Sequence, residues 1–316
     1  VEADRRAQAE QELGCASYAT YEAMLDRAGL DAVVIATPTP FHAPMALQAF
    51  AKGLHVILEK PMALNKAEAD TIAAAAVRAE RRLTVYQPHR LSASFRQVLG
   101  LVRAGVIGDV YMMRSAIFGY SRRNDWQSLQ KFGGGMLNNY GAHAIDQVLA
   151  TIGFDIDRVF AVRQKVASLG DAEDVVKVVM ETRAGVIGEA EISQASVINP
   201  YQMIIWGSHG GILIGADKKN VIQVRRFDPA ALPPKVLNDA LASEGRKYPM
   251  DALACVDEAI PVDPAQAINL FTDFAASIRT GSPPAVRPEE TLAVMEVLDR
   301  SRVDSGAIRV LTGKRS

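Results

Sequence analysis

Several features that mark particular protein classes are scarce in this sequence. Its 316 residues contain two cysteines, Cys15 and Cys255, which cannot form the disulfide framework of a small secreted domain. We expect both to be small buried residues in a reducing compartment, the cytoplasm. Purely apolar runs such as 32–36 fall well short of the roughly 18 residues that a membrane-spanning helix requires. We therefore expect no membrane partner.

An excess of charge of one sign is also missing. Lysine and arginine number 35 against 36 aspartates and glutamates, so the formal net charge is −1. A near-neutral chain lacks the broad basic surface typical of nucleic-acid-binding proteins, and no nucleic-acid partner is expected. With 49% hydrophobic and 22% charged residues, the composition is typical of a folded protein rather than a disordered one.

The motifs of several enzyme classes are lacking as well. The sequence has no cysteine pair, no His-Glu-x-x-His motif and no carboxylate cluster at metal-ligand spacing, so no metal is expected. It also has neither a Gly-x-Ser-x-Gly motif nor a Walker A loop. Metal ligation and hydrolysis by a serine nucleophile are therefore without support.

What the sequence does contain is an alternation of apolar strands and helices over its first hundred residues. The pattern predicts strands at 31–36, 55–58 and 83–87 and helices at about 2–13, 21–27, 43–52, 66–79 and 92–104. Apolar strands separated by helices indicate a parallel sheet that is covered on both sides. Ligands bind such sheets at the carboxyl ends of the strands, which are followed here by Thr37-Pro38, Glu59-Lys60-Pro61 and Gln87–Arg90.

The pattern changes after Gly108. Strands are predicted at 109–119, 158–166, 174–183, 185–193, 201–207 and 219–226, and helices at about 135–152, 264–279 and 288–303. A run of strands indicates a largely antiparallel sheet and hence an α+β domain. Residues 227–262 predict an extended excursion. We place one domain at 1–107 and the second at 108–316.

One candidate for chemistry is Lys60, at the end of an apolar strand. Its ammonium group can donate a hydrogen bond to a substrate oxygen and stabilise a developing alkoxide. Alternatively, Lys60 is a solvated lysine paired with Glu59 in the turn between strand and helix.

A second candidate is the stretch from Gly133 to Asp146, in which three glycines precede a predicted helix. Glycines permit close approach of the backbone to a ligand. Asn139 and His143 are four residues apart and share one helix face. A neutral histidine is suited to move a hydroxyl proton, and Asn139 can orient it or bind substrate. Alternatively, His143 and Asp146 are structural residues at a domain junction.

Three further residues have alternative interpretations. Arg90 either binds a substrate oxygen or carboxylate or forms a surface cap. Trp126, in the loop before the glycines, is either a stacking or lid residue or simply packed. His42 and His55 flank the helix predicted at 43–52, and a structural role is favoured for both.

The order of these motifs resembles the glucose-fructose oxidoreductase, inositol dehydrogenase and MocA-like (Gfo/Idh/MocA) family of nicotinamide-dependent oxidoreductases. The resemblance rests on Ala36-Thr-Pro, His42, Gly53-x-His-Val-x-x-Glu-Lys-Pro61, Gln87–Arg90 and Gly133-Gly-Gly through His143-x-x-Asp146, and on Thr-Gly-x-Pro-Pro near the C-terminus. It implies a Rossmann-like domain followed by an α+β domain. The open sheet of the second domain often forms an oligomer interface, so a dimer or tetramer is expected.

The resemblance also implies a cofactor, a substrate and residue roles. The cofactor is NAD or NADP, and the substrate is a sugar, inositol or related polyol. Lys60 binds the substrate hydroxyl, His143 transfers the proton, and Asn139 replaces an aspartate common in the family, which removes a charge that would raise the basicity of His143. The dinucleotide crevice is expected to contain Thr37, Pro38, His42, Glu59, Lys60, Pro61 and Gln87, with Arg90 and Trp126 near the nicotinamide or substrate.

One expected motif is missing from the start of the chain. A dinucleotide-binding unit begins with a strand, Gly-x-Gly-x-x-Gly and a helix, but no such glycine pattern precedes the strand at 31–36. Aligned with the family, a segment of roughly 30 residues carrying this loop falls upstream of Val1. Otherwise the chain is a truncated relative that holds a dinucleotide poorly.

Two alternatives to a dehydrogenase remain open. A non-catalytic dinucleotide- or sugar-binding regulator would keep the fold, and Asn139 supports this interpretation whereas Lys60 and His143 together oppose it. Glycoside cleavage with a cofactor that cycles is the third hypothesis.

Overall fold

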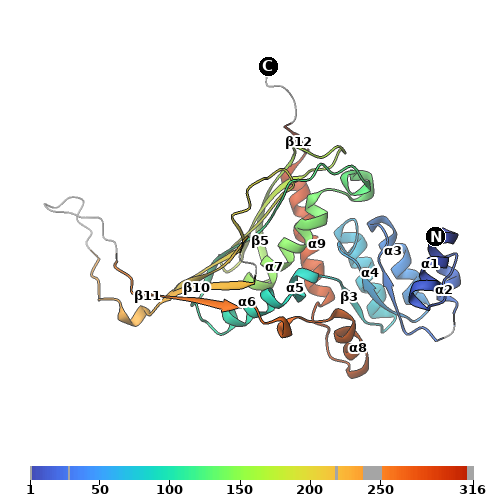
Figure 1. Cartoon of the computed structure of the whole chain (residues 1–316), viewed down its shortest axis with the longest axis horizontal. Coiled ribbons are helices and arrows are strands. Elements are labelled where there is room, and N and C mark those ends of the chain that lie inside the picture. The colour runs from blue at the N-terminus through green and yellow to red at the C-terminus, as the bar shows by residue number, and fades with distance from the viewer. Residues whose placement is uncertain (1, 28, 218–219, 238–250, 312–316) are drawn as a thin grey trace, which may run out of the picture.

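The computed structural model describes residues 2–27, 29–217, 220–237 and 251–311, which form two sheets with helices between them (Figure 1). The smaller sheet is parallel, in the order β1 (Ala32–Ile35), β2 (His55–Leu58) and β3 (Leu83–Val85). Helices α1 (Ala3–Leu13) and α2 (Tyr21–Leu25) precede it, and α3 (His42–Ala51) and α4 (Lys66–Arg78) connect its strands. The predicted parallel sheet with crossover helices is confirmed.

The strands of this sheet differ in burial. In β2, Val56, Ile57 and Leu58 are all buried, as expected for a strand covered on both faces. In β1, Val34 is 52% exposed, so the expectation of complete cover is wrong for that strand.

A break at Ser92 divides the helical segment that follows β3 into two helices. The sequence predicts one helix from residue 92, but the structure has α5 (Pro88–Leu91) before α6 (Ala93–Arg103). Ser92 separates them because its backbone is extended, with ψ at 146°, and its side chain caps α6 by accepting a hydrogen bond from the Phe95 amide. Of the segment Gln87–Arg90, Gln87 therefore precedes a short helix and the other three residues lie within it.

The larger sheet has nine strands in the order β11-β10-β9-β8-β4-β7-β6-β5-β12. Their bounds are β4 (Val110–Phe118), β5 (Ile156–Lys165), β6 (Val175–Thr182), β7 (Ile187–Ser193), β8 (Tyr201–Gly207), β9 (Gly210–Gly215), β10 (Val221–Phe227), β11 (Cys255–Pro261) and β12 (Arg309–Val310). All pairs are antiparallel except β4 with β7 and β5 with β12. The largely antiparallel second sheet is confirmed.

The sequence does not predict β9, β11 or β12. The extended excursion expected over 227–262 is wrong at its end, because β11 pairs along the whole of β10; residues 238–250 lie outside the described residues. β11 is an edge strand with charged side chains, and two of them, Asp257 and Glu258, pair with arginines of β10. A charged edge strand carries little apolar signal.

Helices α7 (Ala142–Ile152) and α9 (Pro288–Ser305) lie between the larger sheet and the first one (Figure 1). α9 contacts β5 of the larger sheet as well as α4 and β3. Helix α8 (Leu270–Thr280) packs on the first sheet through a cluster of Ile57, Leu91, Leu270, Phe274 and Val286. The C-terminal helices thus return to the first sheet.

The remaining elements are short. They are the 3₁₀ turns η1 (Thr39–Phe41), η2 (Trp126–Ser128), η3 (Gln130–Phe132), η5 (Pro229–Ala231) and η6 (Pro264–Gln266), and the π-helical turn η4 (Leu137–Gly141). Among the described residues, no helix has the length and apolar character needed to span a membrane. Both cysteines are free, and the expected burial is wrong for them, since Cys15 is exposed and Cys255 half-buried.

Candidate active site

The carboxyl ends of the three parallel strands form one rim. Thr37 and Pro38 follow β1, the segment 59–61 follows β2, and Gln87 follows β3. The peptide bond between Lys60 and Pro61 is cis. This rim is the edge at which ligands bind sheets of this kind.

His42 fixes the rim from inside. It is 1% exposed, and its ring nitrogens lie 3.0 Å from the Pro61 carbonyl oxygen and 2.8 Å from that of Thr37. Because both nitrogens face backbone carbonyls, His42 is not available to line a dinucleotide crevice. It holds the ends of β1 and β2 together, which is the structural role that the sequence favoured for it.

Lys60 reaches from the rim to the segment before α7. Its Nζ donates hydrogen bonds to the backbone oxygen of Asn139 at 2.9 Å and to Asn139 Oδ1 at 2.7 Å. Burial lowers the pKa of Lys60 to about 8; Glu59 opposes this shift and Arg123 adds to it. Glu59 instead accepts a hydrogen bond from the Lys60 backbone amide. The alternative of a solvated Lys60–Glu59 pair is wrong.

The segment that carries Asn139 is not the regular α-helix that the sequence predicts. Residues 137–141 form the π-helical turn η4, and α7 begins only at Ala142. Asn139 therefore faces Lys60, and its Nδ2 donates to Gln127 Oε1 at 3.3 Å. Asn139 does not orient His143 as expected. π-helical turns of this kind are frequent at functional sites.

The three glycines before this turn serve the packing of the loop itself. A Cβ atom on Gly134 would lie 2.6 Å from the Gln127 carbonyl oxygen, and one on Gly135 would collide with the Glu173 carboxylate. Gly133 has a φ of +72°. The glycines are therefore required by close approach to neighbouring protein atoms, and all three also line a small pocket beside Lys60.

His143, at the start of α7, is held by two contacts. Its Nδ1 lies 2.9 Å from Gln87 Oε1, and its ring stacks on that of His89 with centroids 4.4 Å apart. Burial, followed by Lys60 and His89, lowers the pKa of His143 to about 2, so the imidazole is neutral at pH 7. Gln87, expected in the dinucleotide crevice, is 1% exposed and contacts His143 instead.

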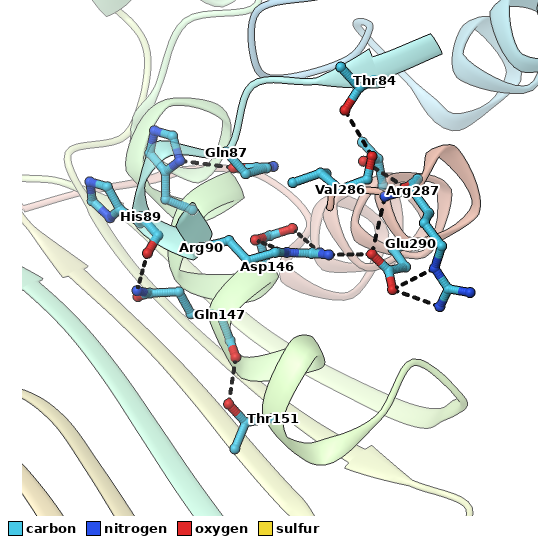
Figure 2. A network of polar contacts seen from close by, with 12 residues as sticks. Thr84, Gln87, His89, Arg90, Asp146, Gln147, Thr151, Val286, Arg287 and Glu290 are labelled. Atoms are coloured by element: carbon cyan, nitrogen blue, oxygen red, sulfur yellow. Dashed lines mark hydrogen bonds and ion pairs between the residues drawn. The ribbon is translucent and has the colours of Figure 1, made fainter. Parts of the chain in front are cut away.

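Arg90 lies in a buried ionic cluster (Figure 2). Its Nε donates to Asp146 Oδ2 at 2.8 Å, a second nitrogen contacts Asp146 Oδ1, and a third contacts Glu290. Arg90 is 4% exposed and Asp146 fully buried. Both expectations for Arg90, substrate binding and a surface cap, are therefore corrected: it joins α5 to α7 and α9. Asp146 has the structural role at the junction.

Two hollows adjoin these residues. A pocket of about 30 Å³ is lined by Lys60, Asn139, Trp126 and the three glycines. Trp126 is 38% exposed, so it is not simply packed. A larger pocket of about 300 Å³ is lined by His89, Ser94, Phe95, Gln147, Asn199, Gln202 and Met203, among others.

Sequence reasoning missed several contacts of this site. Gln127, His89 and the Gln87–His143 pair carry no spacing signal, because each contact joins segments that are distant in the chain. Within the described residues, no group of three or more His, Cys, Asp or Glu side chains could hold a metal ion.

Two family profiles match consecutive parts of the chain. Residues 2–87 match an oxidoreductase family with an NAD-binding Rossmann fold, and residues 95–213 match the GFO/IDH/MocA C-terminal domain. D-apiose dehydrogenase from Paraburkholderia graminis is 27% identical over 294 residues, covering 89% of this chain and 72% of that protein. Myo-inositol 2-dehydrogenase from Thermotoga maritima is 23% identical over 299 residues, covering 92% and 82%.

Solved structures share the fold. A levoglucosan dehydrogenase in complex with NADH and levoglucosan has a TM-score of 0.80 at 19% identity, covering 96% of this chain and 86% of the other. An NAD-binding protein from Listeria innocua has a TM-score of 0.79 at 23% identity, covering 96% and 88%.

Proposed function

The chain belongs to the Gfo/Idh/MocA family of oxidoreductases, and on that premise we propose that it is an NAD(P)-dependent dehydrogenase of a sugar, inositol or related polyol. The observation that carries the proposal is the placement of Lys60, Asn139 and His143 together at the ligand-binding rim of a parallel sheet. The sugar-like substrate is supported by the names of the two relatives.

The described residues fit the nicotinamide end of a dinucleotide. Trp126 is partly exposed beside Lys60, and Thr37 Oγ1 has as its single hydrogen-bond partner among the described residues the Met45 sulfur at 3.5 Å. Thr37, Pro38, Glu59, Pro61 and Trp126 would hold this end. Bound NAD or NADP supplies the hydride acceptor or donor.

Lys60 is placed to bind the substrate oxygen. An ammonium group has three N–H donors, and two of them point to Asn139. The third has no acceptor among the described residues and can donate to a substrate hydroxyl or carbonyl oxygen, where the positive charge stabilises a developing alkoxide. Asn139 thereby positions Lys60.

His143 is placed to exchange the hydroxyl proton. A neutral imidazole has one N–H group and one lone pair, so it can accept a proton in one direction of the reaction and return it in the other. Its pKa of about 2 makes the imidazolium unfavourable. The proton must therefore leave His143 readily.

The pocket of about 300 Å³ beside His89 is the proposed place of the substrate's remaining hydroxyl groups. Asn199 and Gln202 line it and have no side-chain hydrogen bond within the described part of the chain, and Phe95 and Met203 give it an apolar wall. A polyol ring presents both hydroxyl groups and C–H faces, which suits a pocket of this mixed character.

The assay that tests the function mixes the protein with NAD or NADP and a panel of sugars and polyols and follows the absorbance of the reduced cofactor. Net reduction with one or more substrates supports the dehydrogenase. Binding of cofactor or sugar without turnover supports a regulator instead, a function that the neutral Asn139 favours. Cleavage of a glycoside without net reduction supports redox-assisted hydrolysis.

We propose a dimer or tetramer that assembles through the face of the larger sheet turned away from α7. A groove of about 950 Å³ on this face is lined by Ile204, Trp206 and Leu213, among others, and exposed apolar grooves commonly mark contact surfaces. Leu213→Arg is expected to lower the mass measured by light scattering. Val77→Arg, on the exposed face of α4, is the matched control and is expected to leave the mass unchanged.

Two further proposals concern the organisation and location of the chain. We propose the division into 1–107 and 108–316, since the chain passes from α6 to β4 around residue 107. We also propose a cytoplasmic location, which two free cysteines support. Limited proteolysis between α6 and β4 and fractionation of the source cell test these proposals.

A further inference from the structure

We propose that Gln87 is a positioning residue for His143: its amide oxygen fixes the imidazole proton on Nδ1 and so leaves the Nε2 lone pair to exchange a proton with the substrate. The inference rests on the proposed function for the identity of the reaction. It concerns a contact within the protein, however, and can be tested without turnover.

The contact itself is short and enclosed. Gln87 Oε1 lies 2.9 Å from His143 Nδ1, and the two residues are 1% and 4% exposed. An amide oxygen only accepts hydrogen bonds, so a contact with it requires the proton to be on Nδ1. Water does not compete at this position because both partners are buried.

The surroundings of His143 leave the contact with Gln87 to decide which imidazole nitrogen carries the proton. The groups that act on its ring are Lys60 from the end of β2 and His89 from α5, and both disfavour the imidazolium, as burial does. A neutral imidazole carries one proton, and the hydrogen bond of one ring nitrogen decides which nitrogen carries it. Among the described residues no second hydrogen bond reaches the His143 ring, so Gln87 alone selects the tautomer.

A second pair fixes the distance between Gln87 and His143. Arg90 lies three residues after Gln87, and Asp146 lies three residues after His143, so the Arg90–Asp146 ion pair repeats the first contact one helical turn further on. Gln87 immediately precedes α5 and Arg90 lies within it, so both pairs join this segment to α7; Figure 2 shows the Arg90–Asp146 pair. The buried ion pair therefore holds the two segments at the spacing that the Gln87–His143 hydrogen bond requires.

Nuclear magnetic resonance of the imidazole nitrogens in the full chain tests the proposal directly. The chain has five histidines, and the His143 signal is identified by its loss in His143→Gln. In the unsubstituted protein, we expect His143 to carry its proton on Nδ1. In Gln87→Leu, which keeps the volume but removes the acceptor, we expect a mixture of tautomers.

Gln87→Glu sharpens the test because a carboxylate can only accept. We expect this variant to keep the proton on Nδ1 and to raise the pKa of His143, since a nearby negative charge favours the imidazolium. Gln147→Glu is the matched control: Gln147 is four residues along α7 and bonds the His89 backbone oxygen and Ser115 rather than His143. We expect a smaller pKa shift in the control.

Kinetics on an identified substrate separate the inference from the function. In Gln87→Leu, kcat is expected to fall about 10- to 100-fold with an unchanged KM for the cofactor, and Gln87→Glu is expected to recover part of the loss. Absence of turnover in the unsubstituted protein would contradict the proposed function but not the tautomer. A proton on Nε2 in the unsubstituted protein, or an unchanged tautomer in Gln87→Leu, would overturn the inference. If Gln87→Leu fails to fold, the resonances of the imidazole nitrogens in Gln87→Glu and in the unsubstituted protein still test the tautomer.

Discussion

Two cations, the partly buried Lys60 after β2 and the buried Arg90 of α5, reach α7 or the turn before it, and they differ in what they contact. Lys60 contacts a neutral amide, Asn139, and burial lowers its pKa to about 8. Burial also acts to lower the pKa of Arg90, but Asp146 and Glu290 outweigh it and raise the pKa. A cation with no carboxylate partner keeps an available charge, whereas a cation with two partners is neutralised in place.

At this one junction, Arg90 has a structural role, whereas Lys60 is the candidate for chemistry. The buried Arg90 guanidinium is paired with Asp146 and Glu290, and this cluster joins α5 to α7 and α9. Lys60 has a free donor and a pKa close to physiological pH. Lys60 thus differs from Arg90 in having no ion-paired carboxylate among the described residues, although the charge of Glu59 still acts on it.

The largest expected effect is on stability. Asp146→Ala leaves Arg90 buried with Glu290 as its remaining partner, and loss of one member of a buried ion pair costs about 3–5 kcal/mol of the free energy of unfolding. Chemical denaturation measures this. Asp26→Ala, which removes an exposed pair with Lys52, is the control and should change the free energy by about 1 kcal/mol or less. A similar small loss for Asp146→Ala would show that the cluster is not structural.

The matching change at the other cation should act on turnover instead. Lys60→Ala removes the proposed donor to the substrate oxygen and is expected to lower kcat/KM by about 10²-fold or more. His143→Ala should have a similar effect. Because Lys60 has no carboxylate partner to leave unpaired, its removal should cost little stability in the same denaturation experiment. Full turnover in both variants would refute these roles.

The pH dependence of turnover distinguishes the two cations further. Lys60 loses its charge as the pH rises through about 8, so kcat/KM should fall about tenfold per pH unit above that value. Stability should change in the opposite sense. A folded-state pKa below that of the unfolded chain opposes folding while both states are protonated, below pH 8, and this penalty is relieved as the pH rises. A flat rate profile between pH 7 and 10 would contradict the role of the cation.

The smallest expected effect comes from giving Lys60 a carboxylate partner, as Arg90 has. Asn139→Asp places a carboxylate beside the ammonium group and should raise the pKa of Lys60 by about one unit or more. The high-pH limb of the rate profile should then move upward by the same amount. Asn138→Asp is a neighbouring control, since the Asn138 side chain contacts Arg302 and Gly133 rather than Lys60. Equal movement of the limb in both variants would point to a general charge effect.

The sequence allows much of the fold to be predicted because its signals are local. Apolar strands next to turn residues indicate β1 to β3 and most of the larger sheet, and the prolines after Thr37 and Lys60 indicate where strands end. Edge strands such as β11 are missed because their charged side chains resemble those of a loop and pair only with another strand.

The sequence by itself determines which reactive side chains are present and where along the chain they occur: Lys60 after an apolar strand, His143 after three glycines, and a neutral Asn139 between them. The tertiary structure alone decides which of them meet. It pairs Lys60 with Asn139, His143 with Gln87, and Arg90 with Asp146, although each pair lies at least 56 residues apart in the chain. Burial then sets the charge of each group, because it depends on neighbours brought from distant segments, and no local pattern encodes those neighbours.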